Sequence, residues 1–459
     1  MKKFVFDNQK DCFESKDNTE TNISNKKYKY NHYHYHVGDF EQLKKEIDKI
    51  KEPNQKHKIN KKNCFFNEYS NISISNNINS TKKFYKKLLN LKDYKKQIYK
   101  ILKKFMIYFK KGIFVSIRNN KVNMIPMMYY NYKNKFYFKK NNKLKYKYIL
   151  DADEWYLDGC YIRMSIKSKL KSPEWDVSQY KYFLTELCKN RNISDIDFII
   201  NNSDFPVLNK KINFFNNGFL PILSQSSHND FFDLNIPSVD SIEFFYKKYF
   251  VNSNSSSSCR KSFISDVKNV NWDKKINKIF FRGSITGCEI GLKNHRLQAL
   301  MLSKNKKRKI QKYMDVELHP NGTQTYRLTN NKKYSKIPIN KYPFKDDYIP
   351  FNNWSKYKYI LNIEGWVAAN RFLRSISLGS LIINIKSNYS LWFEQFAEKN
   401  KYYVEINDYS KLEKVFFYYN KNPKKAKNIA LNGKKFVEKI LSKKVLYDYM
   451  EFILNKLVS

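Results

Sequence analysis

The second half of the chain predicts an α/β fold built on a parallel sheet. Apolar, strand-like runs at residues 278–284, 357–363 and 380–385 alternate with amphipathic, helix-like runs at 294–304 and 367–378. Strands separated by helices at this spacing pair in parallel, because the chain must cross back over the sheet before it can add the next strand. The sequence therefore predicts a C-terminal domain over residues 263–459, with a parallel sheet followed by further helices.

A separate N-terminal domain is expected over residues 82–255. Its predicted elements are, in order, a helix at 84–109, strand hairpins with Asn-Asn turns at 113–125 and 134–150, a helix at 178–190 and a short buried strand within 196–208. The Ser- and Asn-rich stretch 251–262 is typical of a linker between domains. Residues 1–80 are polar and poorly periodic, apart from a short helical pattern at 40–50. We expect a largely disordered extension there.

The formal net charge of +45 raises the question of a polyanionic partner. The chain has 87 Lys and Arg against 42 Asp and Glu, and such a surplus attracts nucleic acids, phosphates or anionic surfaces. Only 10 of the 87 basic residues are Arg, however, and roughly one residue in eight is Asn, as A+T-rich codons would produce. Because the lysines are scattered, we favour solvated surfaces, and nucleic-acid binding stays the alternative function.

Targeting and metal-binding patterns are not found. The start of the chain has no apolar run long enough for a signal peptide, and no segment is long enough to span a bilayer. We therefore expect a cytoplasmic protein. A viral protein made in the host cytoplasm fits this expectation. Six cysteines lie far apart without a CxxC motif, which predicts reduced thiols rather than disulfides or a zinc site. His32, His34 and His36 alternate along an expected strand, but no Cys or carboxylate stands at ligand spacing, so we expect no metal there.

Glycine and arginine concentrate in two stretches, residues 278–300 and 356–396. These hold five of the 11 glycines and four of the ten arginines. Lysine cannot replace a planar, bidentate guanidinium, and no other residue replaces glycine where the backbone must contact a ligand. The two stretches are therefore where we expect the chemistry.

The first stretch contains the phrase FRGSITG, a strand that enters a Gly-rich turn before a helix begins at HRLQAL. In that turn Ser284 can donate to a phosphate, Thr286 and Gly287 lie beside it, and Arg296 can direct its guanidinium onto the same anion. The spacing matches neither the GxxxxGK[ST] of a P-loop nor the GxGxxG of a dinucleotide site.

The second stretch is a strand, a turn and a helix: YKYILNI, EGW and VAANRFLRSISL. In such units a ligand lies beyond the carboxyl ends of the strands, against free N–H groups of the helix. The residues expected to contact it are Gly365, Trp366, Val367, Ala368 and Arg371. Taken alone, this stretch also fits an ordinary packing unit with a surface arginine. Two phosphate cradles in one domain favour a nucleoside diphosphate over a single phosphate.

Together these phrases resemble glycosyltransferase family 90. FFRGSITG followed by HR, then YKYILNIEGWVAANRFLRSISLGSLI and LWFEQF, is similar to the pattern of the protein O-glucosyltransferases and the fungal capsule-associated xylosyltransferases. From Gly365 through Arg371 to Gly379 the register matches without a gap. The resemblance covers roughly residues 200–410 and is specific as a joint pattern.

The resemblance implies a GT-B architecture, in which two Rossmann-like domains face a cleft that holds a UDP-sugar, with no metal requirement. The expected partners are this donor and a protein or glycan acceptor, and glucose or xylose is the expected sugar. The phrase IINNSDFPVL matches the position of the family's catalytic Asp and assigns Asp204 as the base, although Ser203 replaces the family's Arg. Such a base removes the acceptor's proton during a single, inverting displacement. Without the resemblance, Asp204 would be interpreted as a turn-forming residue before Pro206.

Two further alternatives remain at this point. A metal-dependent transferase would use a DxD pair, and both Asp151-Ala-Asp153 and Asp195-Ile-Asp197 have that spacing. Neither pair follows an apolar strand and precedes a Gly-rich turn as a metal site would need. A catalytically inactive family member that serves as a binding module is the other alternative.

Overall fold

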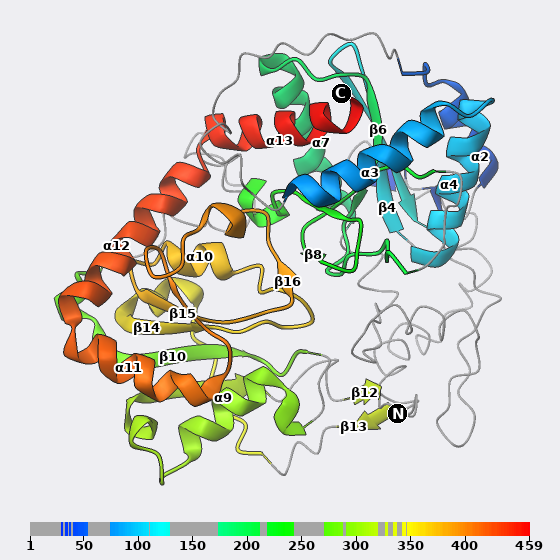
Figure 1. Cartoon of the computed structure of the whole chain (residues 1–459). Helices are drawn as coiled ribbons and strands as arrows, with labels where there is room; N and C mark the ends of the chain where they lie inside the picture. Colours follow the sequence, from blue (N-terminus) through cyan, green and yellow to red (C-terminus); the bar gives the residue numbers. More distant parts are fainter. Residues whose placement is uncertain are drawn as a thin grey trace.

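The fold is described by a computed structural model of the whole chain. It describes residues 40–53, 74–109, 111–128, 173–211, 218–242, 270–287, 291–319, 342–345 and 347–459, together with the short strands β1 (Lys29–Tyr30), β2 (Tyr33–His34), β3 (His36–Val37), β12 (Tyr326–Leu328) and β13 (Tyr334–Lys336). Two sheets, each with its own helices, form the two main parts of the molecule (Figure 1).

The first sheet has six strands in the order β3-β5-β4-β6-β7-β9. Besides β3, these are β4 (Lys111–Arg118), β5 (Lys121–Met128), β6 (Ile196–Asn201), β7 (Ile222–Ser224) and β9 (Leu234–Asn235). The predicted hairpin at 113–125 is confirmed: β4 and β5 pair antiparallel, with Asn119 and Asn120 at φ of 49° and 57° in the turn. Asparagine tolerates this left-handed backbone better than most residues, and two such residues make the tight turn that hairpins favour.

Among the described residues, the helices of this first part are α2 (Phe40–Asp48), α3 (Ile74–Leu89), α4 (Tyr94–Phe109) and α7 (Pro173–Asn190). The prediction of a single helix over 84–109 is wrong. The helix is interrupted at Leu91–Asp93, where Asp93 has a positive φ of 55°. The disorder expected through residue 80 does not hold for residues 40–53 and 74–80. There Leu43, Ile47 and Ile78 are buried, so an amphipathic face is ordered by packing. The second predicted hairpin, 134–150, and the linker, 251–262, lie outside the described residues.

The second sheet has five strands, all parallel, in the order β11-β10-β14-β15-β17. They are β10 (Ile276–Ser284), β11 (Met314–His319), β14 (Tyr357–Asn362), β15 (Leu381–Ile385) and β17 (Val404–Ile406). Numbered along the chain, this order is 2-1-3-4-5, a doubly wound, Rossmann-like arrangement. The predicted parallel sheet is confirmed. Its two edge strands, β11 and β17, were not predicted; burial alternates along both.

The helices of this part are α9 (His295–Lys304), α10 (Phe372–Ile376), α11 (Leu412–Lys421) and α12 (Pro423–Ile440). The helix expected at 367–378 is confirmed only for the five residues of α10. Val367, Ala368 and Ala369 are all buried, and three consecutive buried side chains fit an irregular loop better than the one-sided face of a helix.

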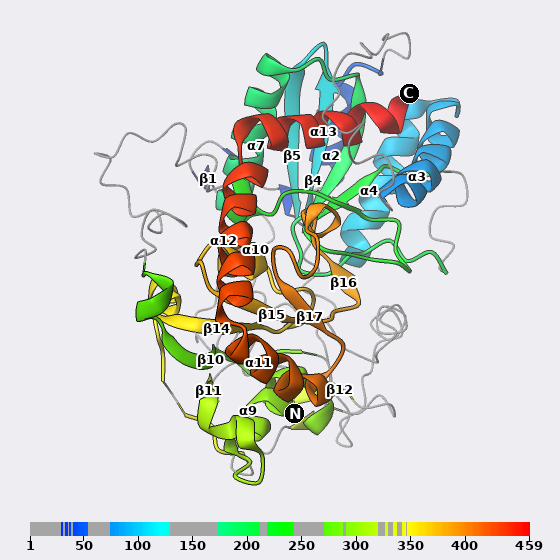
Figure 2. The same cartoon turned by 60° about the vertical axis from the view of Figure 1, so that its left-hand side comes forward.

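The last helix, α13 (Lys443–Val458), returns to the first part of the molecule. It lies beside α3 and α7 in both views (Figures 1 and 2). Arg191 donates to the Asp448 carboxylate at 2.8 Å, and the Asn455 side chain bonds the backbone of Asn192 and Ser194. Leu446, Ile453 and Leu457 enter the same buried cluster as the first sheet. The two parts therefore share one core through α13.

No helix in the described residues is both long enough and apolar enough to cross a membrane.

Candidate functional site

The candidate site lies at the carboxyl edge of the parallel sheet, where β10, β14 and β15 end. The chain leaves the sheet through Ser284–Gly287 after β10, through Ile363–Trp366 after β14 and through Lys386–Ser387 after β15. Because the strand order is 2-1-3-4-5, the chain leaving β10 runs towards one edge of the sheet, to β11, and the chain leaving β14 runs towards the other edge, to β15. The switch point lies between β10 and β14, and ligands of such sheets bind there. The two Gly-rich turns predicted from the sequence thus lie side by side at one place.

The turns contact each other through their glycines. A Cβ on Gly365 would lie 2.7 Å from Thr286 Oγ1 and 3.0 Å from Arg296 Nη2. Gly287 has a φ of +117°, and a Cβ there would lie 2.8 Å from Asn294 Nδ2 and 3.3 Å from the Gly365 carbonyl. Glycine is therefore required at both positions to let the two turns pack. We expected these glycines to approach a ligand, and the structure adds this close contact within the chain.

Arg296 connects the two turns. It is 8% exposed, and its guanidinium donates to the carbonyls of Ser284 (2.9 Å), Ile363 (3.3 Å) and Glu364 (2.8 Å). Arg296 is the second residue of α9, whose N-cap Asn294 accepts from the Leu297 N–H. With three donors on backbone carbonyls, Arg296 acts as a brace between the turns. Its contact with a ligand stays a prediction.

Arg371 presents the opposite situation. Its Nη1 donates to the Arg282 carbonyl at 3.2 Å, while its buried Nη2 has no partner among the described residues. The guanidinium packs 4.8 Å from the Phe281 ring and 5.3 Å from the Trp354 ring, measured to the ring centroids. A Cβ on Gly283 would lie 3.3 Å from Nη2, so that glycine leaves room for it. Desolvation, together with nearby Arg374, lowers the pKa of Arg371 to about 10.

Arg282, a neighbouring arginine, differs from Arg371 because it is paired with carboxylates. Its Nη2 lies 2.6 Å from Asp315 Oδ1 and 2.8 Å from Asp347 Oδ2. Two carboxylates therefore neutralise Arg282, whereas Arg371 forms no ion pair with a carboxylate of the described residues. A second polar atom at the same edge, Thr286 Oγ1, is also buried and has no hydrogen-bond partner in the part of the chain that the structure describes. The edge thus holds an uncompensated cation and an unused hydroxyl, which together can bind an anion.

Three other polar side chains converge next to these turns. Glu364 Oε2 accepts from Ser387 Oγ at 2.5 Å, and Glu364 Oε1 lies 3.3 Å from His295 Nδ1. The Glu364 and His295 side chains are 25% and 32% exposed. The sequence assigned no role to Glu364, Ser387 or His295. They carry no local signal, because segments distant in the sequence bring them together. Trp366 is partly exposed in the same turn, and Val367 and Ala368 are buried behind it.

Asp204 lies on the first sheet, in the turn that follows β6. It is exposed, and the turn is held by Asn201, whose side chain donates to the Phe205 carbonyl at 2.6 Å and accepts from the Ser203 N–H at 3.0 Å. The next residues are fixed by Asp233, which accepts from the N–H groups of Val207 and Leu208 and from Ser224 Oγ. Burial raises the pKa of Asp233 to about 6 despite these three hydrogen bonds. An ordered turn therefore presents Asp204 to solvent.

The two parts of the molecule meet beside this turn, through a small separate sheet of two strands. β8 (Ser227–His228) pairs antiparallel with β16 (Tyr389–Ser390), the segment that follows β15. The Tyr389 ring lies 6.1 Å from Phe205 and 5.2 Å from His228, between ring centroids. Ser390 also accepts from Asn235 Nδ2 at 3.1 Å. Phe205 is adjacent to Asp204, and Tyr389 is two residues from Ser387, so the turn with Asp204 and the carboxyl edge of the parallel sheet are neighbours.

The described DxD pair has a structural role. Asp197 is buried, and its Oδ2 accepts from Arg118 Nη2 and from the Tyr94 hydroxyl, both at 2.6 Å. Asp195 accepts from the Asn119 N–H in the β4–β5 turn at 2.9 Å. These carboxylates brace the hairpin. Asp151 and Asp153 lie outside the described residues. Among the residues that are described, no group of His, Cys, Asp or Glu is arranged to hold a metal ion.

Fold and site together define an α/β protein with a Rossmann-like sheet, whose carboxyl edge holds two Gly-rich turns next to an ordered turn that carries a carboxylate. The sequence model of glycosyl transferase family 90 matches residues 175–458, which include every candidate residue. The chain belongs to glycosyl transferase family 90, and the resemblance stated from the sequence is confirmed.

Similar proteins come from viruses and from animals. The chain is 28% identical to the uncharacterized protein 179R of Invertebrate iridescent virus 6, over 76% of this chain and 36% of that protein. It is 27% identical to the uncharacterized protein 035R of Invertebrate iridescent virus 3, over 67% and 29%. It is also 27% identical to protein O-glucosyltransferase 3 of Mus musculus, over 60% and 49%. The chain thus spans about a third of these viral relatives and about half of the mouse protein.

Proposed function

We propose that this chain transfers a sugar, with glucose or xylose expected, from a UDP-sugar to a hydroxyl of a protein or glycan acceptor. The observation that carries the proposal is Arg371, a guanidinium at the switch point of the parallel sheet whose buried Nη2 has no hydrogen-bond partner among the residues that the structure describes. A cation left without a carboxylate at a ligand-binding edge indicates that a ligand anion completes it. The relatedness to protein O-glucosyltransferases supports sugar transfer as the purpose of that anion site.

The donor's diphosphate would lie across the two Gly-rich turns. Arg371 would donate to a phosphate oxygen with Nη2, Ser284 and Thr286 would add their hydroxyls, and Arg296 would keep the turns in register. Negative charge develops on the leaving phosphate as the sugar departs, and fixed donors aimed at that charge lower the barrier. In this arrangement protein cations perform the stabilisation, so we propose transfer without a metal ion.

Asp204 is proposed as the general base. An exposed carboxylate on an ordered turn can accept the proton of an acceptor hydroxyl while that hydroxyl attacks the anomeric carbon. One displacement by one acceptor inverts the anomeric configuration. The pairing of β8 with β16 supports this proposal, because the Asp204 turn lies beside the carboxyl edge of the parallel sheet, where we propose that the donor binds. Because two α/β parts lie on either side of one site, we also propose a GT-B architecture. We further propose a cytoplasmic location.

The test is a thermal-unfolding titration with UDP, UDP-glucose and UDP-xylose, with and without EDTA. A ligand that binds the folded state stabilises it by ~2.7 kcal/mol at a hundredfold excess over its dissociation constant. We expect a rise in melting temperature that survives EDTA and is much smaller in Arg371→Lys, which keeps the charge but loses the planar fork. No shift for wild type at millimolar UDP would refute the donor assignment. A shift without transfer to any acceptor would indicate a binding module.

A further inference from the structure

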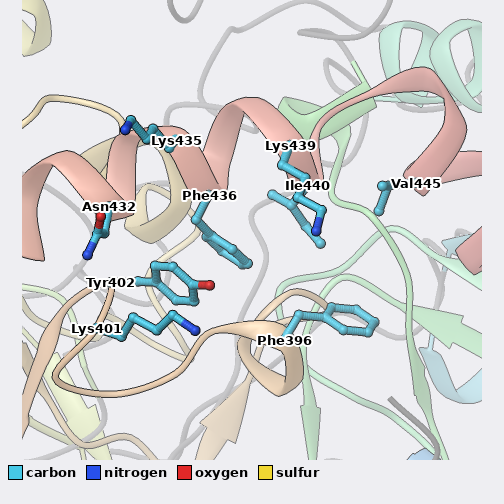
Figure 3. Close-up of a pocket in the computed structure, with 9 residues that line it drawn as sticks. All are labelled: Phe396, Lys401, Tyr402, Asn432, Lys435, Phe436, Lys439, Ile440 and Val445. Carbon is cyan, nitrogen blue, oxygen red and sulfur yellow. The ribbon is translucent and has the colours of Figure 1, made fainter. Parts of the chain in front are cut away.

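A second cavity, of about 260 Å³, is formed by elements that do not contribute to the strand-end site. It lies between α12, the start of α13 and the segment that joins β16 to β17 (Figure 3). Its interior is apolar, because Phe396, Phe436, Ile440 and Val445 line it and all four are buried. Tyr402 stacks on Phe436 with 4.6 Å between ring centroids and 22° between planes, and so forms one aromatic wall.

The rim of this cavity is basic. Lys435 and Lys439 lie one turn apart on α12, both are exposed, and neither has an ion-pair partner in the part of the chain that the structure describes. Lys401 stands on the opposite side of the mouth and is paired with Glu398 at 2.6 Å (Figure 3). The positive end of the α13 dipole adds to the field, since α13 begins at Lys443 next to the cavity. The mouth therefore attracts negative charge around an apolar interior.

We propose that this cavity is a docking site for an acidic peptide segment, with one bulky apolar side chain of that segment inserted between Tyr402 and Phe396. Interfaces commonly combine a desolvated aromatic anchor in a pocket with charged contacts at the rim. The volume lies below the range usual for sites of complete small-molecule ligands and cofactors, which argues against a nucleotide. The apolar walls argue against a sugar, whose hydroxyls would lose their hydrogen bonds to water. Charge complementarity with Lys435 and Lys439 selects carboxylates as the neighbours of the anchor.

The experiment measures fluorescence anisotropy of a labelled peptide with a central Trp between runs of Glu, at low ionic strength. We expect saturable binding that UDP does not displace. Replacing the Trp by Ala should weaken binding about ten- to hundredfold, the loss expected when a large buried side chain is removed. A peptide with Lys in place of Glu should not bind. The double variant Lys435→Glu with Lys439→Glu should weaken binding at least about tenfold through charge reversal at the rim.

Two further variants make the test specific. Lys414→Glu with Lys421→Glu changes the net charge equally on exposed positions of α11 and should leave binding within about twofold. Asn432→Trp places a large ring at the mouth, from an exposed position, and should block the anchor while the protein stays folded. Equal binding of the Trp and Ala peptides, equal loss in the α11 control, or displacement by UDP would each overturn the proposal. Binding of the acidic Trp peptide would remain even if no nucleotide binds at the strand ends, so the two proposals fail separately.

Discussion

Replacing Arg371 by Met should strengthen the ligand-free fold while removing donor binding. Methionine has a similar length and no charge, so it can fill the space between Phe281 and Trp354. Desolvation lowers the pKa of Arg371 to about 10, a drop that at about 1.4 kcal/mol per pKa unit corresponds to about 3 kcal/mol against the charged form. Two effects reduce this gain in stability by about 1 to 2 kcal/mol. Part of the Arg371 side chain reaches solvent, and the variant loses the hydrogen bond to the Arg282 carbonyl and two cation–π contacts.

The expected net gain in the free energy of unfolding is therefore about 1 to 2 kcal/mol, measured by urea denaturation without ligand. The same variant should show no UDP-dependent shift in melting temperature. Arg282→Met is the matched control, because the buried Arg282 is paired with Asp315 and Asp347 and its loss leaves these two partly exposed carboxylates without their cation. That control should destabilise the protein by about 1 to 3 kcal/mol. If Arg371→Met instead destabilised the protein by more than about 2 kcal/mol and kept UDP binding, the arginine would be a packing residue.

Three further predictions concern the two sides of the site. Asp204→Asn should keep the melting temperature and the UDP shift but lower transfer by about two to four orders of magnitude, with an inverted product from wild type; near-normal transfer by the variant would return Asp204 to a turn-forming role. Gly365→Ala should lower the free energy of unfolding by about 1 to 3 kcal/mol in urea, because its Cβ meets Thr286 and Arg296, whereas an unchanged value would show that these side chains can move aside. The folded-state pKa of Asp233, about 6, lies above the ordinary value of 3.8, so folding takes up a proton and this carboxyl stabilises the fold at low pH and loses that contribution as pH rises through 6. Urea titrations of wild type minus Asp233→Asn should show this decline of about 2 to 3 kcal/mol between pH 4 and pH 7, and a flat difference would contradict it.

Local patterns predicted the parts of this protein that local forces determine. The Asn119–Asn120 hairpin, the strands that end in the two Gly-rich turns and the clustering of Gly and Arg at those turns were all visible in the sequence. The direction of the arginines was not, since it depends on which partners the fold supplies: Arg296 meets carbonyls from β10 and β14, while Arg371 meets one carbonyl and two aromatic rings. The irregular loop before α10 was missed for the same reason, because burial on all sides overrides helical periodicity.

The proximity of the two sheets was also beyond sequence reasoning. The contact of Phe205 with Tyr389 joins residues far apart in the chain, and neither residue stands in a recognisable motif for such a contact. The family resemblance supplied the expectation that Asp204 works with the donor edge. In the structure, the pairing of β8 with β16 brings the Asp204 turn close to the carboxyl edge of the parallel sheet.

The return of α13 to the first sheet has a consequence for synthesis of the chain on the ribosome. Residues on α13 that complete the core around α3 and α7 are made long after those helices; the hydrogen bond between Ser194 and Asn455 spans 261 residues. Until α13 emerges, the apolar surface that Leu446, Ile453 and Leu457 later cover stays open to water. Domains are generally expected to fold in order from the N-terminus as they are made. Here the first part should mature last, with a lag that favours chaperone binding, and high contact order should make its refolding slow.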